Sequence, residues 1–175
     1  MCREKTYIFR IRKQEAGNNE NKKTRRSEKY MEKTINCLNQ FLADLAVFYR
    51  KLQNFHWNVE GKDFFVIHAK LEEYYDDINK QIDEIAEYIL SIGGQPLGTM
   101  KDYMEITKIQ EAENVKVKSD AVLSCLIKDY ETILQEAKQI KQESDASNDS
   151  QTSTMMDDYI EDYSKKLWML RQTMA

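Results

Sequence analysis

Two pairs of potential metal ligands are spaced four residues apart. His68 precedes Glu72, and Asp83 precedes Glu87. Residues four apart lie on one face of an α-helix, so each pair can present two side chains to one metal ion. Imidazole and carboxylate donors suit iron, manganese or zinc, and an open iron site predicts oxidation of ferrous iron. The alternative interpretation is a solvated acidic helix face, which is common in a chain with 32% charged residues.

The two pairs are too far apart to share a metal within one chain. At the rise of an α-helix they are separated by roughly 22 Å, although they lie within an arc of about 100°. If two chains pack antiparallel about a two-fold axis near Ile78, His68 and Glu72 of one chain face Asp83 and Glu87 of the other. The spacing therefore predicts two equivalent sites in a dimer.

Four long amphipathic helices are predicted to carry these residues. Their apolar stripes run from Ile35 to Phe55, Ile67 to Ile92, Val122 to Ile140 and Met156 to Leu170. Gly93, Gly94 and Pro96 end the second helix, and Ser119 is the expected cap of the third. About 25 residues separate these two helices, with a short helix expected near Met100 to Ile106. One long crossover in the middle predicts an all-α, ferritin-like four-helix bundle.

Composition excludes several other classes of protein. With 175 residues and 41% apolar side chains, the chain is the size of one globular domain. Five glycines and one proline argue against sheet-rich folds and glycine-loop nucleotide sites. The three cysteines have no paired spacing, which favours a reducing cytoplasm. No signal peptide or membrane span is recognisable, so we expect a soluble cytoplasmic protein without a membrane partner.

Charge divides the chain into two parts. Residues 1–30 carry ten Lys or Arg against four Glu, whereas residues 31–175 have a net charge of −10. We therefore predict a basic, disordered extension over residues 1–30 and a bundle domain over residues 31–175. A basic arm could bind DNA, but Met31 is also a natural start, so residues 1–30 could be an extension outside the native protein.

Two segments of the sequence resemble the Dps family of mini-ferritins, the DNA-binding proteins from starved cells. The stretch FHWNVEGKDFFVIHAKLEE contains His56, Trp57, Gly61, His68 and Glu72 in the order found in that family. The stretch IDEIAEYILSIGGQP supplies the acidic pair and the glycines that follow it. The resemblance covers residues 31–175. Tyr88 stands where the family usually has Arg.

This resemblance implies a ferroxidase that prefers hydrogen peroxide to dioxygen and stores ferric mineral inside a hollow dodecamer. It assigns metal binding and catalysis to His56, His68 and Glu72 of one subunit and to Asp83 and Glu87 of its neighbour. It also places Trp57 beside the iron, and Asp145 and Asp149 at a pore through which iron would enter. The expected outcome is storage of iron and protection of DNA from oxidative damage.

Other functions remain open from the sequence. The protein could instead pack the nucleoid through its basic arm, with iron chemistry secondary, or it could be a structural bundle that keeps the ligand types. Zinc is an alternative to iron because affinity alone favours zinc.

Overall fold

The chain forms two compact units, Met1–Lys33 and Thr34–Ala175. The computed structural model describes the backbone of residues 2–175 and the side chains of residues 29–175. Helix α1 (Cys2–Asn58) contributes to both units. The predicted DNA-binding arm falls in residues 1–30, whose side chains up to residue 28 lie outside the described part. That arm stays a prediction.

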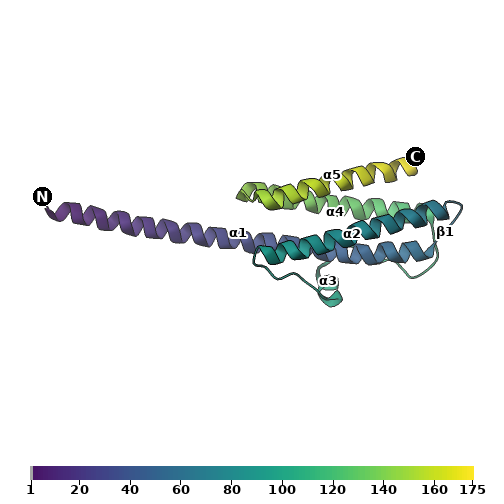
Figure 1. The fold of residues 1–175 in the computed structure, drawn as a ribbon, viewed down its shortest axis with the longest axis horizontal. Helices are drawn as coiled ribbons and strands as arrows, with labels where there is room; N and C mark the ends of the chain where they lie inside the picture. The colour runs from purple at the N-terminus through teal and green to yellow at the C-terminus, as the bar shows by residue number, and fades with distance from the viewer. Residues whose placement is uncertain (1) are drawn as a thin grey trace. The chain divides into compact units, whose positions relative to one another are not determined.

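The second unit is a bundle of four long helices (Figure 1). Its helices are residues 34–58 of α1, α2 (Phe64–Ser91), α4 (Ser119–Ser147) and α5 (Ser150–Thr173). The short helix α3 (Met100–Ile106) lies within the crossover between α2 and α4. The predicted all-α, ferritin-like bundle with a helix in its crossover is confirmed.

The core of the bundle is filled by the predicted apolar stripes and by aromatic rings. Phe48, Tyr130 and Tyr163 are fully buried, and the Phe48 and Tyr130 rings meet edge to face with centroids 4.9 Å apart. Buried aromatic side chains contribute large apolar areas to a core. Because one face of each helix is committed to this core, the face of α2 that carries Glu72 and Asp83 is left exposed.

Glycine ends α2 as predicted. Gly93 has a φ of 83°, and its N–H donates to the Leu90 carbonyl while the Gly94 N–H donates to the Ile89 carbonyl. These two bonds make a Schellman motif, which needs a left-handed residue at the position of Gly93. The predicted cap of α4 is wrong, because Ser119 is the first helical residue and Lys118 occupies the cap position. Ser119 is buried there, and its hydroxyl has no hydrogen-bond partner among the described residues, so it does not serve as a cap.

Polar side chains of α1 fasten the crossover to the bundle. The buried Asp44 carboxylate accepts hydrogen bonds from the Thr107 hydroxyl at 2.7 Å and from the backbone N–H groups of Lys108 and Ile109. Asn39 accepts from the Leu97 N–H at 2.8 Å. At its far end, the crossover forms strand β2 (Val117–Lys118), which pairs in parallel with β1 (Val59–Glu60). The crossover is thus held against α1 over its first part and against β1 at its far end.

A ladder of polar pairs joins α1 to the antiparallel α4. The Cys37 thiol donates to Glu143 at 3.5 Å, and Lys51 forms a buried ion pair with Asp129 at 2.7 Å. Midway between these pairs, the carboxyl groups of Asp44 and Glu136 lie close enough to interact, and Lys108 donates to Glu136. Burial and the neighbouring Asp44 raise the pKa of Glu136 to about 7 against the opposing effect of Lys108. Below about pH 7, a protonated Glu136 could donate to the Asp44 carboxylate.

In the described part of the chain, no helix is long and apolar enough to cross a membrane.

Candidate metal centre

His56 and His68 are brought together by the short link between α1 and α2. His56 lies in the last turn of α1, and His68 lies in the second turn of α2. The link turns at Gly61, whose φ of 144° is rarely adopted by other residues. The two imidazole rings stack with centroids 3.7 Å apart and an interplanar angle of 20°.

The Nδ1 atom of each histidine holds its ring in place through a hydrogen bond. The Nδ1 of His56 lies 2.8 Å from the His68 carbonyl oxygen, and the Nδ1 of His68 lies 2.8 Å from the His56 carbonyl oxygen. A carbonyl oxygen only accepts hydrogen bonds, so both Nδ1 atoms carry the proton. The Nε2 atoms are then left as lone-pair donors, which is the state in which histidine binds a metal.

Glu72 is the third predicted ligand on this half of the site. Its carboxylate is exposed, and Tyr75 lies three residues further along the same face of α2. The Tyr75 ring stands perpendicular to the His56 ring, with centroids 5.4 Å apart. Sequence reasoning did not identify Tyr75 as part of this cluster. Its position three residues after Glu72, on the same helical face, is the signal that could have found it.

Asp83 and Glu87 lie together on the other half of α2. Both line a groove of about 440 Å³ with Glu84, Tyr88 and residues of α2 and α5. Both carboxylates are exposed, and neither makes a hydrogen bond or ion pair within the described part of the chain. They are therefore open to a cation that approaches from outside the subunit.

One subunit does not bring all five predicted ligands together. Among the described residues, no group of three or more His, Cys, Asp or Glu side chains is placed to hold a metal ion. The histidine pair and the acidic pair are separated along α2 by roughly 22 Å, as the helical rise requires. A complete site of these five residues therefore needs a second subunit. The donor types themselves, imidazole nitrogen and carboxylate oxygen, fit ferrous iron.

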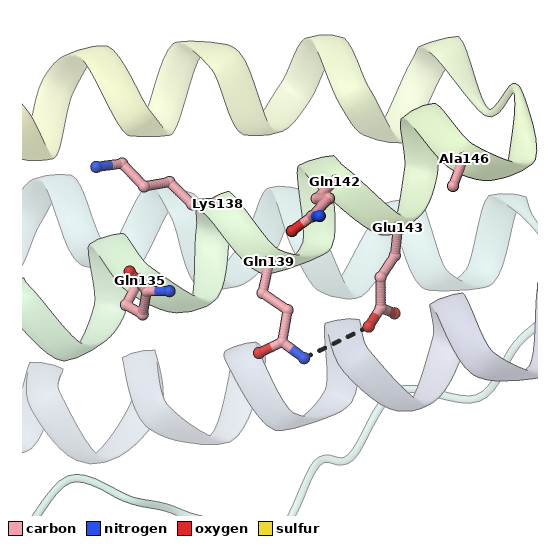
Figure 2. A pocket seen from close by; sticks show the side chains of 6 residues that line it. All are labelled: Gln135, Lys138, Gln139, Gln142, Glu143 and Ala146. Atoms are coloured by element: carbon pink, nitrogen blue, oxygen red, sulfur yellow. Dashed lines mark hydrogen bonds between the residues drawn. The ribbon is translucent and has the colours of Figure 1, made fainter.

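A second groove of the bundle has a different character. Its volume is about 490 Å³, and Figure 2 shows that its lining comes from successive turns of α4. The described lining residues are Gln135, Lys138, Gln139, Gln142, Glu143 and Ala146. The single carboxylate in this set, Glu143, accepts a hydrogen bond from Gln139 and contacts Cys37. This groove offers amides rather than metal ligands.

The remaining predicted site residues are Trp57 and the two aspartates Asp145 and Asp149. Trp57 follows His56 and is 58% exposed. The Asp149 carboxylate accepts from the Thr152 N–H at 3.1 Å and from its hydroxyl at 2.6 Å, so it caps the start of α5. Asp145 accepts from Ser153 at 2.6 Å. Both predicted pore residues therefore already have hydrogen-bond partners inside the subunit, and their role in a pore stays a prediction.

Tyr88 also makes a hydrogen bond within the chain. Its hydroxyl lies 2.7 Å from the Thr152 hydroxyl, which itself donates to Asp149. Tyr88 must therefore donate to Thr152, and this contact ties the end of α2 to the start of α5.

Comparison with known proteins places this geometry in a family. Residues 35–175 match the ferritin-like domain family. The chain is 43% identical over 137 residues to DNA protection during starvation protein 2 of Bacillus anthracis, covering 78% of this chain and 93% of that protein. The chain belongs to the Dps family of ferritin-like proteins.

Solved Dps structures share the fold. The Dps protein of Vibrio cholerae O1, described as a ferritin-like diiron-carboxylate protein, superposes with a TM-score of 0.81 at 33% identity and covers 84% of this chain and 92% of its own. Dps of Listeria innocua soaked with zinc has a TM-score of 0.78 at 31% identity, with coverages of 81% and 95%. The Dps assignment therefore rests on both sequence and fold.

Proposed function

We propose that this Dps-family protein oxidises ferrous iron with hydrogen peroxide and stores the ferric product as mineral in a hollow shell of twelve subunits. The observation that carries the proposal is the division of the ligands between the two ends of α2, with His56 of α1 stacked on His68 at one of them. His56, His68 and Glu72 offer two imidazole nitrogens and a carboxylate at one end, and Asp83 and Glu87 offer two exposed carboxylates at the other.

Two antiparallel copies of α2 would complete two sites. A two-fold axis at the level of Ile78 places the histidine pair of one subunit opposite the acidic pair of its partner. The exposure of Glu72, Asp83 and Glu87 in the single subunit supports this arrangement, because an inward-facing set would have no access to a partner. Each completed site has few protein ligands, which leaves coordination positions for the oxidant.

The chemistry protects DNA because it reduces peroxide by two electrons. Two ferrous ions each lose one electron, the O–O bond of peroxide breaks, and the two oxygens take up two protons from solvent and leave as water. A single ferrous ion would deliver one electron and release a hydroxyl radical. The five ligands would hold the ferrous ions, and Trp57 beside His56 would intercept a stray oxidising equivalent.

The first experiment is anaerobic addition of ferrous iron, followed by substoichiometric peroxide, with ferric absorbance and assembly size recorded on one sample. We expect rapid oxidation in a large assembly and loss of oxidation in the Asp83→Ala, Glu87→Ala double variant. Oxidation at the protein-free rate by the unmodified protein would leave a structural bundle that keeps the ligand types.

Mixed assemblies test whether the site is shared between subunits. His68→Ala and the Asp83→Ala, Glu87→Ala variant should each be inactive. After dissociation and reassembly together, half of the dimers are mixed and each has one intact site, so about a quarter of the unmodified activity should return. No recovery in correctly assembled mixtures would show that all five ligands act within one subunit.

Zinc is expected to compete with iron at the same ligands. A related Dps from Listeria innocua has been soaked with zinc, and zinc binds histidine and carboxylate donors more tightly than ferrous iron does. Added zinc should therefore inhibit oxidation, and direct titration should show that His68→Ala weakens zinc binding.

DNA binding is the second candidate function, favoured by the ten basic residues among residues 1–30. The rest of the chain has a net charge of −10, which repels phosphate. We expect the full chain, but not residues 31–175, to retard DNA in a gel, and the shift to weaken steeply with salt. Equal retardation by both forms would place DNA binding outside the arm.

A further inference from the structure

A tyrosine of α5 donates a hydrogen bond to a carboxylate that lies beside the acidic pair of α2. The Tyr159 hydroxyl donates to Glu84 at 2.7 Å. Glu84 directly follows Asp83 and lines the same groove as Asp83 and Glu87. The Tyr159 side chain is buried, whereas Glu84 is exposed. An oxidisable phenol therefore lies next to this groove, and its proton is already directed at a carboxylate.

Tyr159 is also the end member of a row of buried aromatic rings. Its ring stacks on Tyr163 with centroids 6.0 Å apart and an interplanar angle of 27°. Tyr163 lies 5.9 Å from Tyr130, and Tyr130 lies 5.7 Å from Tyr74. These are contact distances for aromatic pairs, so an electron can pass from one ring to the next.

The hydroxyl partners distinguish Tyr159 from the other rings of this row. A phenol that loses an electron becomes a strong acid, so the oxidised ring persists where a base takes up its proton. Tyr163 donates to the amide oxygen of Gln81, which is a far weaker base than a carboxylate. The Tyr130 hydroxyl is buried and has no hydrogen-bond partner in the described part of the chain. An electron vacancy in the row should therefore settle on Tyr159.

We propose that Tyr159 is a redox-active residue that supplies one electron when a single ferrous ion at the acidic pair has reacted with peroxide. This inference rests on the proposed function, because that reaction supplies the oxidant. Tyr159 would then act as a store of one oxidising equivalent until a second ferrous ion arrives.

The electrons and protons of this sequence balance in three steps. A single ferrous ion gives one electron to peroxide, and the O–O bond breaks into hydroxide and a hydroxyl radical. Tyr159 gives one electron to that radical, which becomes hydroxide, while the phenol proton moves along the hydrogen bond to Glu84. A later ferrous ion reduces the phenoxyl radical, which takes its proton back from Glu84. The sum is two ferrous ions oxidised and one peroxide reduced, with no radical released.

The test is freeze-quench electron paramagnetic resonance on the full-length assembly, with fewer ferrous ions than sites and an excess of peroxide. We expect a tyrosyl radical, identified by a narrower signal when the protein contains deuterated tyrosine, and discharged by a second addition of ferrous iron. Tyr159→Phe keeps the ring and removes the hydroxyl, so it should lose this signal. Glu84→Gln keeps Tyr159 and replaces the base by an amide, so it should lose the signal as well.

Tyr163→Phe and Tyr88→Phe are the matched controls, because these hydroxyls bond to an amide and to the Thr152 hydroxyl. Both variants should keep the signal. A tyrosyl signal of unchanged size in Tyr159→Phe or Glu84→Gln, or none in the unmodified protein while iron is oxidised, would overturn the inference and leave the metal site in place. An unchanged signal in the Asp83→Ala, Glu87→Ala variant would instead show that the oxidant forms elsewhere, which overturns the proposed site and the role of Tyr159 with it.

Discussion

His56 and His68 hold one another through reciprocal hydrogen bonds, in which the Nδ1–H of each ring donates to the backbone carbonyl of the other at 2.8 Å. The end of α1 and the start of α2 are thus joined by the same two side chains that we assign to the metal. Both rings are also restrained by stacking at 3.7 Å. The fold therefore fixes the protonation pattern of the two imidazoles before a metal binds.

This arrangement predicts the tautomer of both histidines. In metal-free protein at about pH 8, where an ordinary imidazole is neutral, the ¹⁵N spectrum should show protonated Nδ1 and unprotonated Nε2 in both rings. The chain has only two histidines, so the assignment needs only the His56→Gln variant. Protonated Nε2 in either ring would contradict the prediction and would remove that ring as a ready ligand.

The buried Glu136 predicts that stability falls as the pH rises. Its pKa is raised from 4.5 to about 7 in the folded protein, by burial first and by Asp44 second. The folded state thus keeps a proton that the unfolded chain releases, so the stabilisation is complete below about pH 4.5 and is lost by about pH 7. The loss is at most about 3 kcal/mol.

Urea unfolding between these pH values measures this effect. Glu136→Gln keeps a donor for Asp44 and an acceptor for Lys108, and it should remove that part of the pH dependence. Glu111→Gln is the control, because Glu111 is exposed. A Glu136→Gln profile parallel to that of the unmodified protein would show that Glu136 is ionised in the fold throughout.

Removal of the Asp44 carboxylate should loosen the crossover. Asp44→Ala removes the acceptor of the Lys108 N–H and the nearer acceptor of the Thr107 hydroxyl, and it leaves the Ile109 N–H with the Thr107 oxygen alone. Because buried donors without partners are costly, we expect the free energy of unfolding to fall by roughly 3 to 5 kcal/mol. Amide hydrogen exchange at residues 108 and 109 should accelerate. Asp44→Asn retains an acceptor oxygen and should lose much less; equal losses would mean that the charge, and not the hydrogen bonds, matters.

The end of α2 should be sensitive to side chains at Gly93. Gly93→Ala places a Cβ at a φ of 83°, which should reduce the free energy of unfolding by about 1 kcal/mol. Gly98→Ala is the control, because Gly98 has ordinary φ and open space around it. Thermal melting of the two variants checks the difference. Equal melting temperatures would show that the Schellman motif is not needed to end this helix.

Much of the fold could be predicted from the sequence because it depends on local patterns. Apolar residues at helical spacing gave the four long helices, and Gly93 gave the end of α2. The predicted cap at Ser119 was wrong because serine is common at cap positions. In the structure Ser119 is buried within the first turn of α4. The four-residue spacings also predicted the candidate ligand pairs, which stay a prediction, since a helix places residues four apart on a shared face.

Contacts between distant segments were not predictable in the same way. The histidine contact depends on the turn at Gly61, which brings each side chain to a backbone carbonyl of the other helix. The Asp44–Glu136 pair depends on how α1 and α4 are aligned. Asp44 interrupts a long apolar run in α1, and this interruption was the available signal of a buried carboxylate with a structural role.

The ladder between α1 and α4 also constrains how the two helices can change length. Cys37, Asp44 and Lys51 are seven residues apart, and so are their partners Asp129, Glu136 and Glu143. A single-residue insertion between Cys37 and Lys51 would rotate the following residues by about 100° and break the downstream pairs together. Point substitutions in this segment are therefore far easier to accommodate over evolutionary time than insertions or deletions. A gap between Cys37 and Lys51 in an alignment would mark a relative whose α1 and α4 are aligned differently.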